Sequence, residues 1–239
     1  EVGSFVNPKS VPAMANTDVL LDKLSTTKSN YSVLIPNTFG YKAAKENRVK
    51  EICLVLCATE SMNLENINKS IEDTIVEFKE IIQMTKQDNI RSKIYLSVAF
   101  ECPYEGIVNP DYIRELTKDF LSNGVNEVVI ADTIGAGKPE QVKKLFNTLV
   151  NDFGPSKFSA HFHDTKSLAI PNVRAAMKEG ISKFDSCIAG LGGCPFAPGA
   201  SGNLATENLV SMLHKEGIET GIDEEMLRES VKLASKLTS

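Results

Sequence analysis

Short apolar or β-branched runs, each followed by a stretch with helical spacing, recur along the whole chain. Buried parallel strands joined by crossover helices produce this alternation. The sequence therefore predicts an α/β fold built on seven strands. The runs are EVGSFV from residue 1, YSVLIP from 31, EICLVLC from 51, KIYLSVAF from 93, EVVIAD from 127, KFSAHFH from 157 and KFDSCIAG from 183.

Two of the intervening stretches carry apolar stripes at a period of 3.6 residues. Helices that cover a parallel sheet need such a buried face, so we assign both stripes to core packing rather than to binding. The first stripe comprises Val142, Leu145, Phe146, Leu149, Val150 and Phe153, and the second comprises Ile67, Ile71, Ile75, Phe78 and Ile82.

Seven strands are one fewer than the eight that close a TIM (β/α)8 barrel. A doubly wound sheet would more often carry a Gly-rich phosphate fingerprint after its first strand, and SFVNPKSVP is not one. We therefore predict a TIM barrel whose first βα unit is absent from this chain, with an open sheet as the alternative. The 239 residues, 42% of them hydrophobic, suffice for a large core, and we expect a single domain over residues 1–239.

Charge and cysteine content narrow the classes of partner. The net charge is −5, and Lys and Arg are scattered without a basic run, which disfavours nucleic acid and an anionic membrane surface and favours a small molecule. Five cysteines without a CxxC pair indicate a reducing compartment rather than a secreted disulfide framework. No apolar run approaches the roughly 18 residues of a membrane span, and the polar first residues lack the form of a signal peptide.

Two histidines stand at the end of a predicted strand. His161 and His163 in SAHFHD are two residues apart, and side chains at this spacing point to the same face of a strand. Two imidazoles converging at the carboxyl end of a barrel strand are an arrangement typical of metal ligands. The third histidine, His214, falls in a helical stretch and is interpreted as a surface residue.

A loop rich in glycine and proline, GLGGCPFAPGASGN, runs from Gly190 to Asn203 and carries Cys194. Half of its residues are Gly or Pro, so it is neither helix nor strand interior. A surface loop with an incidental cysteine is one interpretation, and a loop that shapes a site is the other. Asn203 could cap the following helix. If instead it supplies an oxygen beside the two imidazoles, the mixed N/O ligand set suits Mg²⁺ or Mn²⁺.

Four segments carry a resemblance to a known family: AHFHDTKSLA, VAFECPYEG, ADTIGAG and AGLGGCPFAPGASGNLATE. Together with EVGSFVNPKSVPAMA at the start, they resemble 3-hydroxy-3-methylglutaryl-CoA lyase over essentially the whole chain. Isopropylmalate and homocitrate synthases of the same superfamily share the His-x-His pair and the Asn but resemble the cysteine loop much less. The loop therefore favours a lyase over a synthase.

The resemblance implies roles for ten residues. His161, His163 and Asn203 match the metal ligands of the family, and Cys194 matches its catalytic loop cysteine. Tyr95, Glu207, Glu1, Ser4, Asp132 and Thr133 match positions close to the site, the first two as catalytic and the last four as substrate-binding residues. Alternatives stay open, because Asp132 and Thr133 could begin a helix and Tyr95 could fill the core.

The implied reaction is a divalent-metal-assisted retro-Claisen cleavage of the CoA thioester to acetyl-CoA and acetoacetate, as in leucine degradation and ketone-body formation. The expected cofactor is Mg²⁺ or Mn²⁺, the expected compartment is the bacterial cytoplasm or the mitochondrial matrix, and a homodimer is compatible with both. The Arg-Asp-Gly-Leu-Gln motif of the family's first strand, whose Asp is a further metal ligand, does not occur here. An inactive or partner-binding remnant of the enzyme is therefore the competing hypothesis, and a synthase is the weaker one.

Overall fold

The computed structural model describes residues 1–27, 29–192 and 202–237. They form two compact units. Unit 1 comprises Glu1–Ser97 and Asp111–Val129, and unit 2 comprises Val98–Pro110 and Ile130–Ser239. A single domain over the whole chain stays a prediction.

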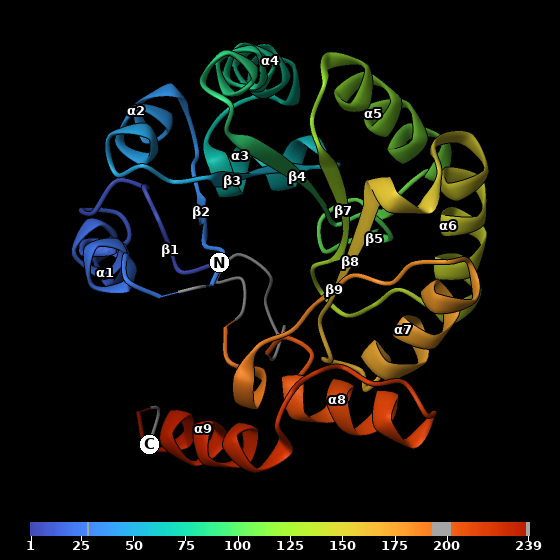
Figure 1. Cartoon of the computed structure of the whole chain (residues 1–239). Helices are drawn as coiled ribbons and strands as arrows, with labels where there is room; N and C mark the ends of the chain where they lie inside the picture. Colours follow the sequence, from blue (N-terminus) through green and yellow to red (C-terminus); the bar gives the residue numbers. More distant parts are fainter. Residues whose placement is uncertain (28, 193–201, 238–239) are drawn as a thin grey trace. The chain divides into compact units, whose positions relative to one another are not determined.

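Unit 1 alternates strands with helices, coloured from blue to green in Figure 1. Its strands pair in parallel, with Gly3 opposite Val33, Val33 opposite Ile52 and Ile52 opposite Ser92. Its elements are β1 (Gly3–Ser4), α1 (Thr17–Leu24), β2 (Ser32–Leu34), α2 (Thr38–Glu46), β3 (Glu51–Cys57), α3 (Glu60–Ile67), α4 (Ile71–Asp88), β4 (Arg91–Ser97), α5 (Pro110–Asn123) and the first half of β7 (Glu127–Asp132), with a 3-10 turn at Pro12–Met14.

Unit 2 continues the pattern from the second half of β7 and ends in a run of helices. Its further elements are a short antiparallel hairpin of β5 (Glu101–Cys102) and β6 (Gly106–Ile107), then α6 (Pro139–Phe153), a 3-10 turn at Pro155–Lys157, β8 (Phe158–Phe162), α7 (Ala169–Lys178), β9 (Phe184–Asp185), the 3-10 turn η3 (Ile188–Gly190), α8 (Thr206–Lys215) and α9 (Glu224–Leu237).

The strand order distinguishes the two predicted architectures. Among the described residues the main sheet has seven strands in the order β1-β2-β3-β4-β7-β8-β9, so successive strands of the βα repeat are always neighbours. A doubly wound sheet reverses its direction at a switch point, whereas a barrel does not. The seven-strand prediction is confirmed, and the alternative of an open doubly wound sheet is wrong. The fold is of the TIM-barrel type.

The two predicted apolar stripes have different outcomes. In α6, Val142, Leu145, Phe146 and Leu149 are buried as predicted. The second stripe is wrong at its start, because Ile67 ends α3 and Ile71 begins α4. Asn68 breaks the helix by adopting a left-handed conformation with φ of 58°, which asparagine tolerates better than most residues. A period of 3.6 residues that runs across such a break does not reveal it.

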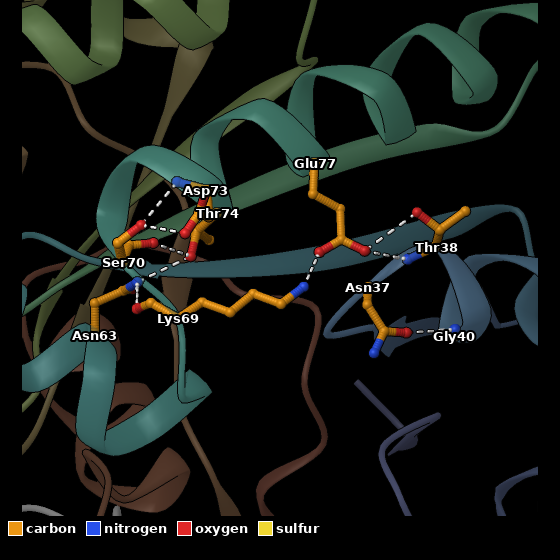
Figure 2. Close-up of polar contacts among 9 residues, drawn as sticks. All are labelled: Asn37, Thr38, Gly40, Asn63, Lys69, Ser70, Asp73, Thr74 and Glu77. Atoms are coloured by element: carbon orange, nitrogen blue, oxygen red, sulfur yellow. Dashed lines mark hydrogen bonds and ion pairs between the residues drawn. The ribbon is translucent and has the colours of Figure 1, made fainter.

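A polar network in unit 1 fixes the start of α4 (Figure 2). Asn63 is fully buried, and its side chain accepts from the Cys57 amide at 3.1 Å and donates to Lys69 O and Thr74 Oγ1, both at 2.9 Å. Ser70 caps α4 by accepting from the Asp73 amide at 3.0 Å. Every buried side-chain polar atom of Asn63 and Thr74 thus has a partner, and we assign a structural role to the network.

Glu77, one turn further along α4, ties this helix to α2. Its carboxylate accepts from the Thr38 amide at 3.0 Å and from the Thr38 hydroxyl at 3.2 Å, and it also pairs with Lys69. Figure 2 shows Lys69 reaching from one end of the network to Glu77.

No described helix is long and apolar enough to cross a membrane.

Candidate active site

The two predicted histidine ligands lie together at the end of β8. The ring centroids of His161 and His163 are 5.1 Å apart, so the two imidazoles converge as their spacing predicts. His163 is buried, whereas His161 is partly exposed and contacts the Asp185 carboxylate of β9, with 3.3 Å between Nδ1 and Oδ2. The end of β8 therefore presents two nitrogen ligands to one place.

Asn203 comes to the same place from the far end of the glycine-rich segment. It forms an isolated antiparallel bridge with His163, and the neighbouring Leu204 amide donates to Phe162 O at 3.0 Å. The amide nitrogen of its side chain donates to Leu191 O at 2.8 Å, which leaves the oxygen Oδ1 for another partner. Helix α8 begins at Thr206 with Ala205 as its N-cap residue. The interpretation of Asn203 as a helix cap is therefore wrong.

Glycine at position 190 allows this close approach. Gly190 has φ of +64°, and a Cβ there would lie 2.9 Å from the carbonyl oxygen of Asn203. A larger residue would be strained in this left-handed conformation, and its Cβ would clash with that oxygen. The sequence thus brings the Asn203 backbone against η3 and its side chain toward His163.

Two buried polar atoms at this place have no hydrogen-bond partner among the described residues. They are Nδ1 of His163 and Oδ1 of Asn203. Leaving such atoms without a partner is costly, and a ligand that binds there would remove the cost. Burial lowers the pKa of His163 to about 4, and His161 acts in the same direction while Asn203 opposes it. His163 is therefore neutral near pH 7, as a metal ligand must be.

The chemistry of these three side chains fits a divalent cation. Two imidazoles and one amide oxygen form a mixed N/O set. No group of three or more His, Cys, Asp or Glu side chains that could hold a metal occurs in the part of the chain described by the structure. The candidate metal centre therefore depends on the amide of Asn203 in addition to the two histidines.

Asp132 ends β7 beside this centre, and Thr133 follows it in the chain. The Asp132 carbonyl accepts from the His163 amide at 3.2 Å, and its buried carboxylate accepts from the amides of Ala136 and Gly137, both at 3.0 Å. Burial raises the pKa of Asp132 to about 6, although the two amides act in the opposite direction. The Thr133 hydroxyl accepts from the Val98 amide at 2.8 Å. Since α6 begins only at Pro139, the interpretation of these residues as a helix start is wrong.

Glu207, in the first turn of α8, supports the stem of the cysteine loop. Its carboxylate accepts from the Ala189 amide at 3.1 Å, in the middle of η3. Ala189 has φ of +57°, a conformation that a residue with a Cβ rarely adopts and that other contacts must hold in place. Glu207 therefore stabilises the backbone from which the loop departs.

The other predicted site residues divide into two groups. Cys194 lies outside the described residues. Glu1, Ser4 and Tyr95 belong to unit 1, where Glu1 is exposed and Ser4 is buried with its hydroxyl donating to Leu34 O at 3.2 Å. Tyr95 lies in β4 opposite Val55 and is only partly buried, so it does not simply fill the core. The roles of these four residues stay predictions.

Sequence reasoning missed Asp185. It lies in the run KFDSCIAG and ends β9, because only Phe184 and Asp185 of that run form a strand. Cys187 lies beyond this strand and is partly exposed. No short motif marks this residue, because the carboxylate falls beside the first histidine only through the register of β8 against β9.

Comparisons with known proteins bear on this geometry. Residues 5–233 match a protein family described as HMGL-like. Hydroxymethylglutaryl-CoA lyase of Pseudomonas mevalonii is 37% identical over 239 residues, which cover 99% of this chain and 79% of that protein. The chain belongs to the HMGL-like family. The mitochondrial hydroxymethylglutaryl-CoA lyase of Homo sapiens is 42% identical over 231 residues, covering 96% of this chain and 71% of that protein.

A solved structure of an HMG-CoA lyase matches the fold. It is an HMG-CoA lyase from Acinetobacter baumannii in complex with coenzyme A and 3-methylmalate, with a TM-score of 0.94 and 35% identity, covering 98% of this chain and 77% of that chain. The His-x-His strand, the Asn203 bridge and the glycine-rich segment thus stand in a chain that has both the sequence and the fold of this family of lyases.

Proposed function

We propose that this protein cleaves 3-hydroxy-3-methylglutaryl-CoA to acetyl-CoA and acetoacetate as a divalent-metal-dependent carbon-carbon lyase. The observation that carries the proposal is the pair of unpartnered buried atoms, His163 Nδ1 and Asn203 Oδ1, beside His161. The relatives named hydroxymethylglutaryl-CoA lyase favour this reaction over condensation by a synthase. The relative solved with coenzyme A supports a CoA thioester as the substrate class.

His161, His163 and Asn203 would hold the metal ion, and Mg²⁺ or Mn²⁺ suits their mixed nitrogen and oxygen donors. Bound there, a divalent cation lowers the pKa of a substrate hydroxyl and stabilises developing negative charge on oxygen. His163 contributes by staying neutral and buried, so that its lone pair is available at neutral pH.

The remaining residues of the proposal act on protons and on substrate position. The cleavage turns the hydroxyl of the substrate into a carbonyl and releases a thioester enolate, so one proton leaves the hydroxyl and one is added to the enolate carbon. Cys194 is the proposed donor of the second proton, because a thiol with an ordinary pKa near 8.5 can give up a proton near neutral pH.

Glu207, Asp132 and Thr133 are the proposed site residues that lie in unit 2 with the metal centre. Glu207 holds the backbone of η3 at Ala189. Asp132, with a pKa of about 6, can change protonation near neutral pH, which suits a group that contacts a reacting hydroxyl. Tyr95 as a catalytic residue, and Glu1 and Ser4 as substrate-binding residues, complete the proposal from the family resemblance.

The compartment and the assembly belong to the same proposal. A relative named as mitochondrial and a bacterial relative support either the mitochondrial matrix or the bacterial cytoplasm. A homodimer stays a prediction, as does the absence of nucleic-acid and membrane partners. Leucine degradation and ketone-body formation are the pathways in which this reaction would serve.

The test is release of acetoacetate from 3-hydroxy-3-methylglutaryl-CoA, measured after chelator treatment and after addition of Mg²⁺ or Mn²⁺. We expect turnover only with added metal. Calorimetry with Mn²⁺ on the same protein separates the two parts of the proposal. Metal binding without turnover would favour the inactive remnant, and no metal binding would contradict the assigned ligands.

A further inference from the structure

Asp185 is a carboxylate outside the motifs that carry the family resemblance. Strands β8 and β9 pair in parallel, with Ala160 opposite Phe184 and His161 opposite Asp185. Residues directly opposite one another on paired strands place their side chains on the same face of the sheet. The register alone therefore puts this carboxylate beside the first histidine of the pair.

The contact fixes which nitrogen of His161 the carboxylate meets. Nδ1 of His161 lies 3.3 Å from Oδ2 of Asp185. An ionised carboxylate only accepts hydrogen bonds, so this contact favours the tautomer with hydrogen on Nδ1. In a neutral imidazole with hydrogen on Nδ1, the lone pair that can bind a metal ion is on Nε2.

We propose that Asp185 is a positioning residue that holds His161 in the tautomer and ring orientation in which Nε2 serves as the metal ligand. This inference rests on the proposed function. A carboxylate behind a ligating histidine raises the basicity of the ligand and fixes its orientation, and losing such a partner typically weakens metal binding about 10- to 100-fold.

The second histidine gives an internal contrast. Nδ1 of His163 has no hydrogen-bond partner among the described residues, and the group bridged to His163 is Asn203, an amide rather than a carboxylate. The contact of Asp185 with His161 therefore distinguishes the two imidazoles. A variant at Asp185 should change the NMR signals of His161 and leave the tautomer of His163 as it was.

The primary test reads the tautomer in metal-free protein. The chain has three histidines, so long-range ¹H–¹⁵N NMR resolves three imidazoles, and a His214→Gln variant identifies the signal of His214. Spectra are recorded at about pH 8.5, roughly two units above the ordinary histidine pKa. We expect hydrogen on Nδ1 of His161 in the parent protein and a raised population with hydrogen on Nε2 in Asp185→Asn.

The second readout is Mn²⁺ affinity by calorimetry on the same variants. We expect the dissociation constant to rise about 10- to 100-fold in Asp185→Asn and to recover largely in Asp185→Glu, which restores the carboxylate. Asp185→Ser removes the carboxylate by truncation and serves if the Asn variant does not fold. Glu179→Gln is the charge-matched control, because the Glu179 carboxylate accepts a hydrogen bond from Asn147 and not from a histidine.

The outcomes separate this inference from the proposed function. Parent protein that binds no Mn²⁺ contradicts the proposed metal centre, and this result comes from the parent alone. An Asp185→Asn variant that keeps the His161 tautomer of the parent overturns the inference whatever the parent binds. A changed tautomer with unchanged Mn²⁺ affinity overturns it as well, because Asp185 would then not serve the metal site.

Discussion

Two buried polar clusters of this molecule differ in how completely their atoms are partnered. In unit 1, Asn63 makes three hydrogen bonds and none of its buried side-chain atoms lacks a partner. In unit 2, His163 and Asn203 each bury an atom without a partner in the part of the chain that the structure describes. A satisfied network stabilises a fold by itself, whereas an unsatisfied one is stabilised when a ligand binds.

The difference separates stability from function. Changes in the unit 1 network should lower the free energy of unfolding and leave metal binding alone. Changes at the unit 2 centre should abolish metal binding at little cost in stability. Four substitutions test this separation: His163→Phe at the unit 2 centre, Asn63→Ala and Glu77→Gln in unit 1, and Cys194→Ser at the proposed proton donor.

The largest effect is expected for His163→Phe, which keeps a ring of similar shape and removes the nitrogen atoms. Because a bound metal supplies several kcal/mol of charge stabilisation, turnover should fall by more than about 10⁴-fold. Mn²⁺ binding should disappear from calorimetry. The melting temperature of the metal-free protein should stay unchanged or rise, because the substitution removes the buried Nδ1 atom that has no partner among the described residues.

His214→Gln is the control for this variant. His214 contacts Glu224 at 2.5 Å and Thr220 at 2.9 Å, outside the metal centre. It should bind Mn²⁺ as the parent does. A His163→Phe protein that still binds Mn²⁺ with the affinity of the parent would show that the unpartnered atoms are not a metal site.

The next effect in size is expected for Cys194→Ser. A hydroxyl is a far weaker acid than a thiol, and losing a general acid typically costs about 10²- to 10⁴-fold in turnover. Mn²⁺ affinity and the melting temperature should not change, so this variant separates proton donation from metal binding. Parent-level turnover in Cys194→Ser would contradict the proton-donor role.

Alkylation gives an independent measurement on the same thiol. Cys53, Cys57 and Cys102 are buried, and burial, with a contribution from Glu1, raises the pKa of Cys53 to about 12. These three should react slowly with iodoacetamide, since the thiolate is the reactive form. Cys194 should be modified first, and Cys187, which is partly exposed, is the internal reference.

A smaller effect, on stability alone, is expected for Asn63→Ala in unit 1. The change removes the three hydrogen bonds to Cys57, Lys69 and Thr74 from a buried site, which should lower the free energy of unfolding by about 3 kcal/mol. Urea denaturation measures the loss, with the exposed Asn151→Ala as control. Unchanged Mn²⁺ affinity is part of the expectation. Weaker metal binding in folded Asn63→Ala protein would contradict the separation of stability from metal binding.

The fold was largely predictable from the sequence because its evidence is local. Strand runs and apolar periods revealed seven strands and the buried face of α6, since burial imposes these patterns directly. The helix break at Asn68 was not predictable from the stripe, because a left-handed residue interrupts the helix without changing the apolar spacing.

The site was predictable only in part, because some of the residues that meet there are far apart in the sequence. The convergence of His161 and His163 followed from their spacing in one strand. The role of Asn203 remained open between cap and ligand, because its bridge to His163 joins residues forty positions apart. The contact between His161 and Asp185 required the register of β8 against β9, which no short motif encodes.

The smallest effect is expected for Glu77→Gln, and it appears in the pH dependence of stability. Burial opposes ionisation of Glu77, but Lys69 and the two donors of Thr38 outweigh it and lower its pKa. An acid with a lowered pKa in the folded state adds stability above its unfolded pKa, near 4.3, and this stability is lost as the pH falls through the folded value. The free energy of unfolding of the parent should therefore exceed that of Glu77→Gln by roughly 1 kcal/mol at pH 7, and the difference should shrink below about pH 4.3. Urea titrations from pH 7 downward measure it, with Glu80→Gln on the exposed face of α4 as control. If the difference in unfolding free energy stayed constant with pH, the charge of Glu77 would add nothing to stability. The contacts of Glu77 in unit 1 would then act as neutral hydrogen bonds.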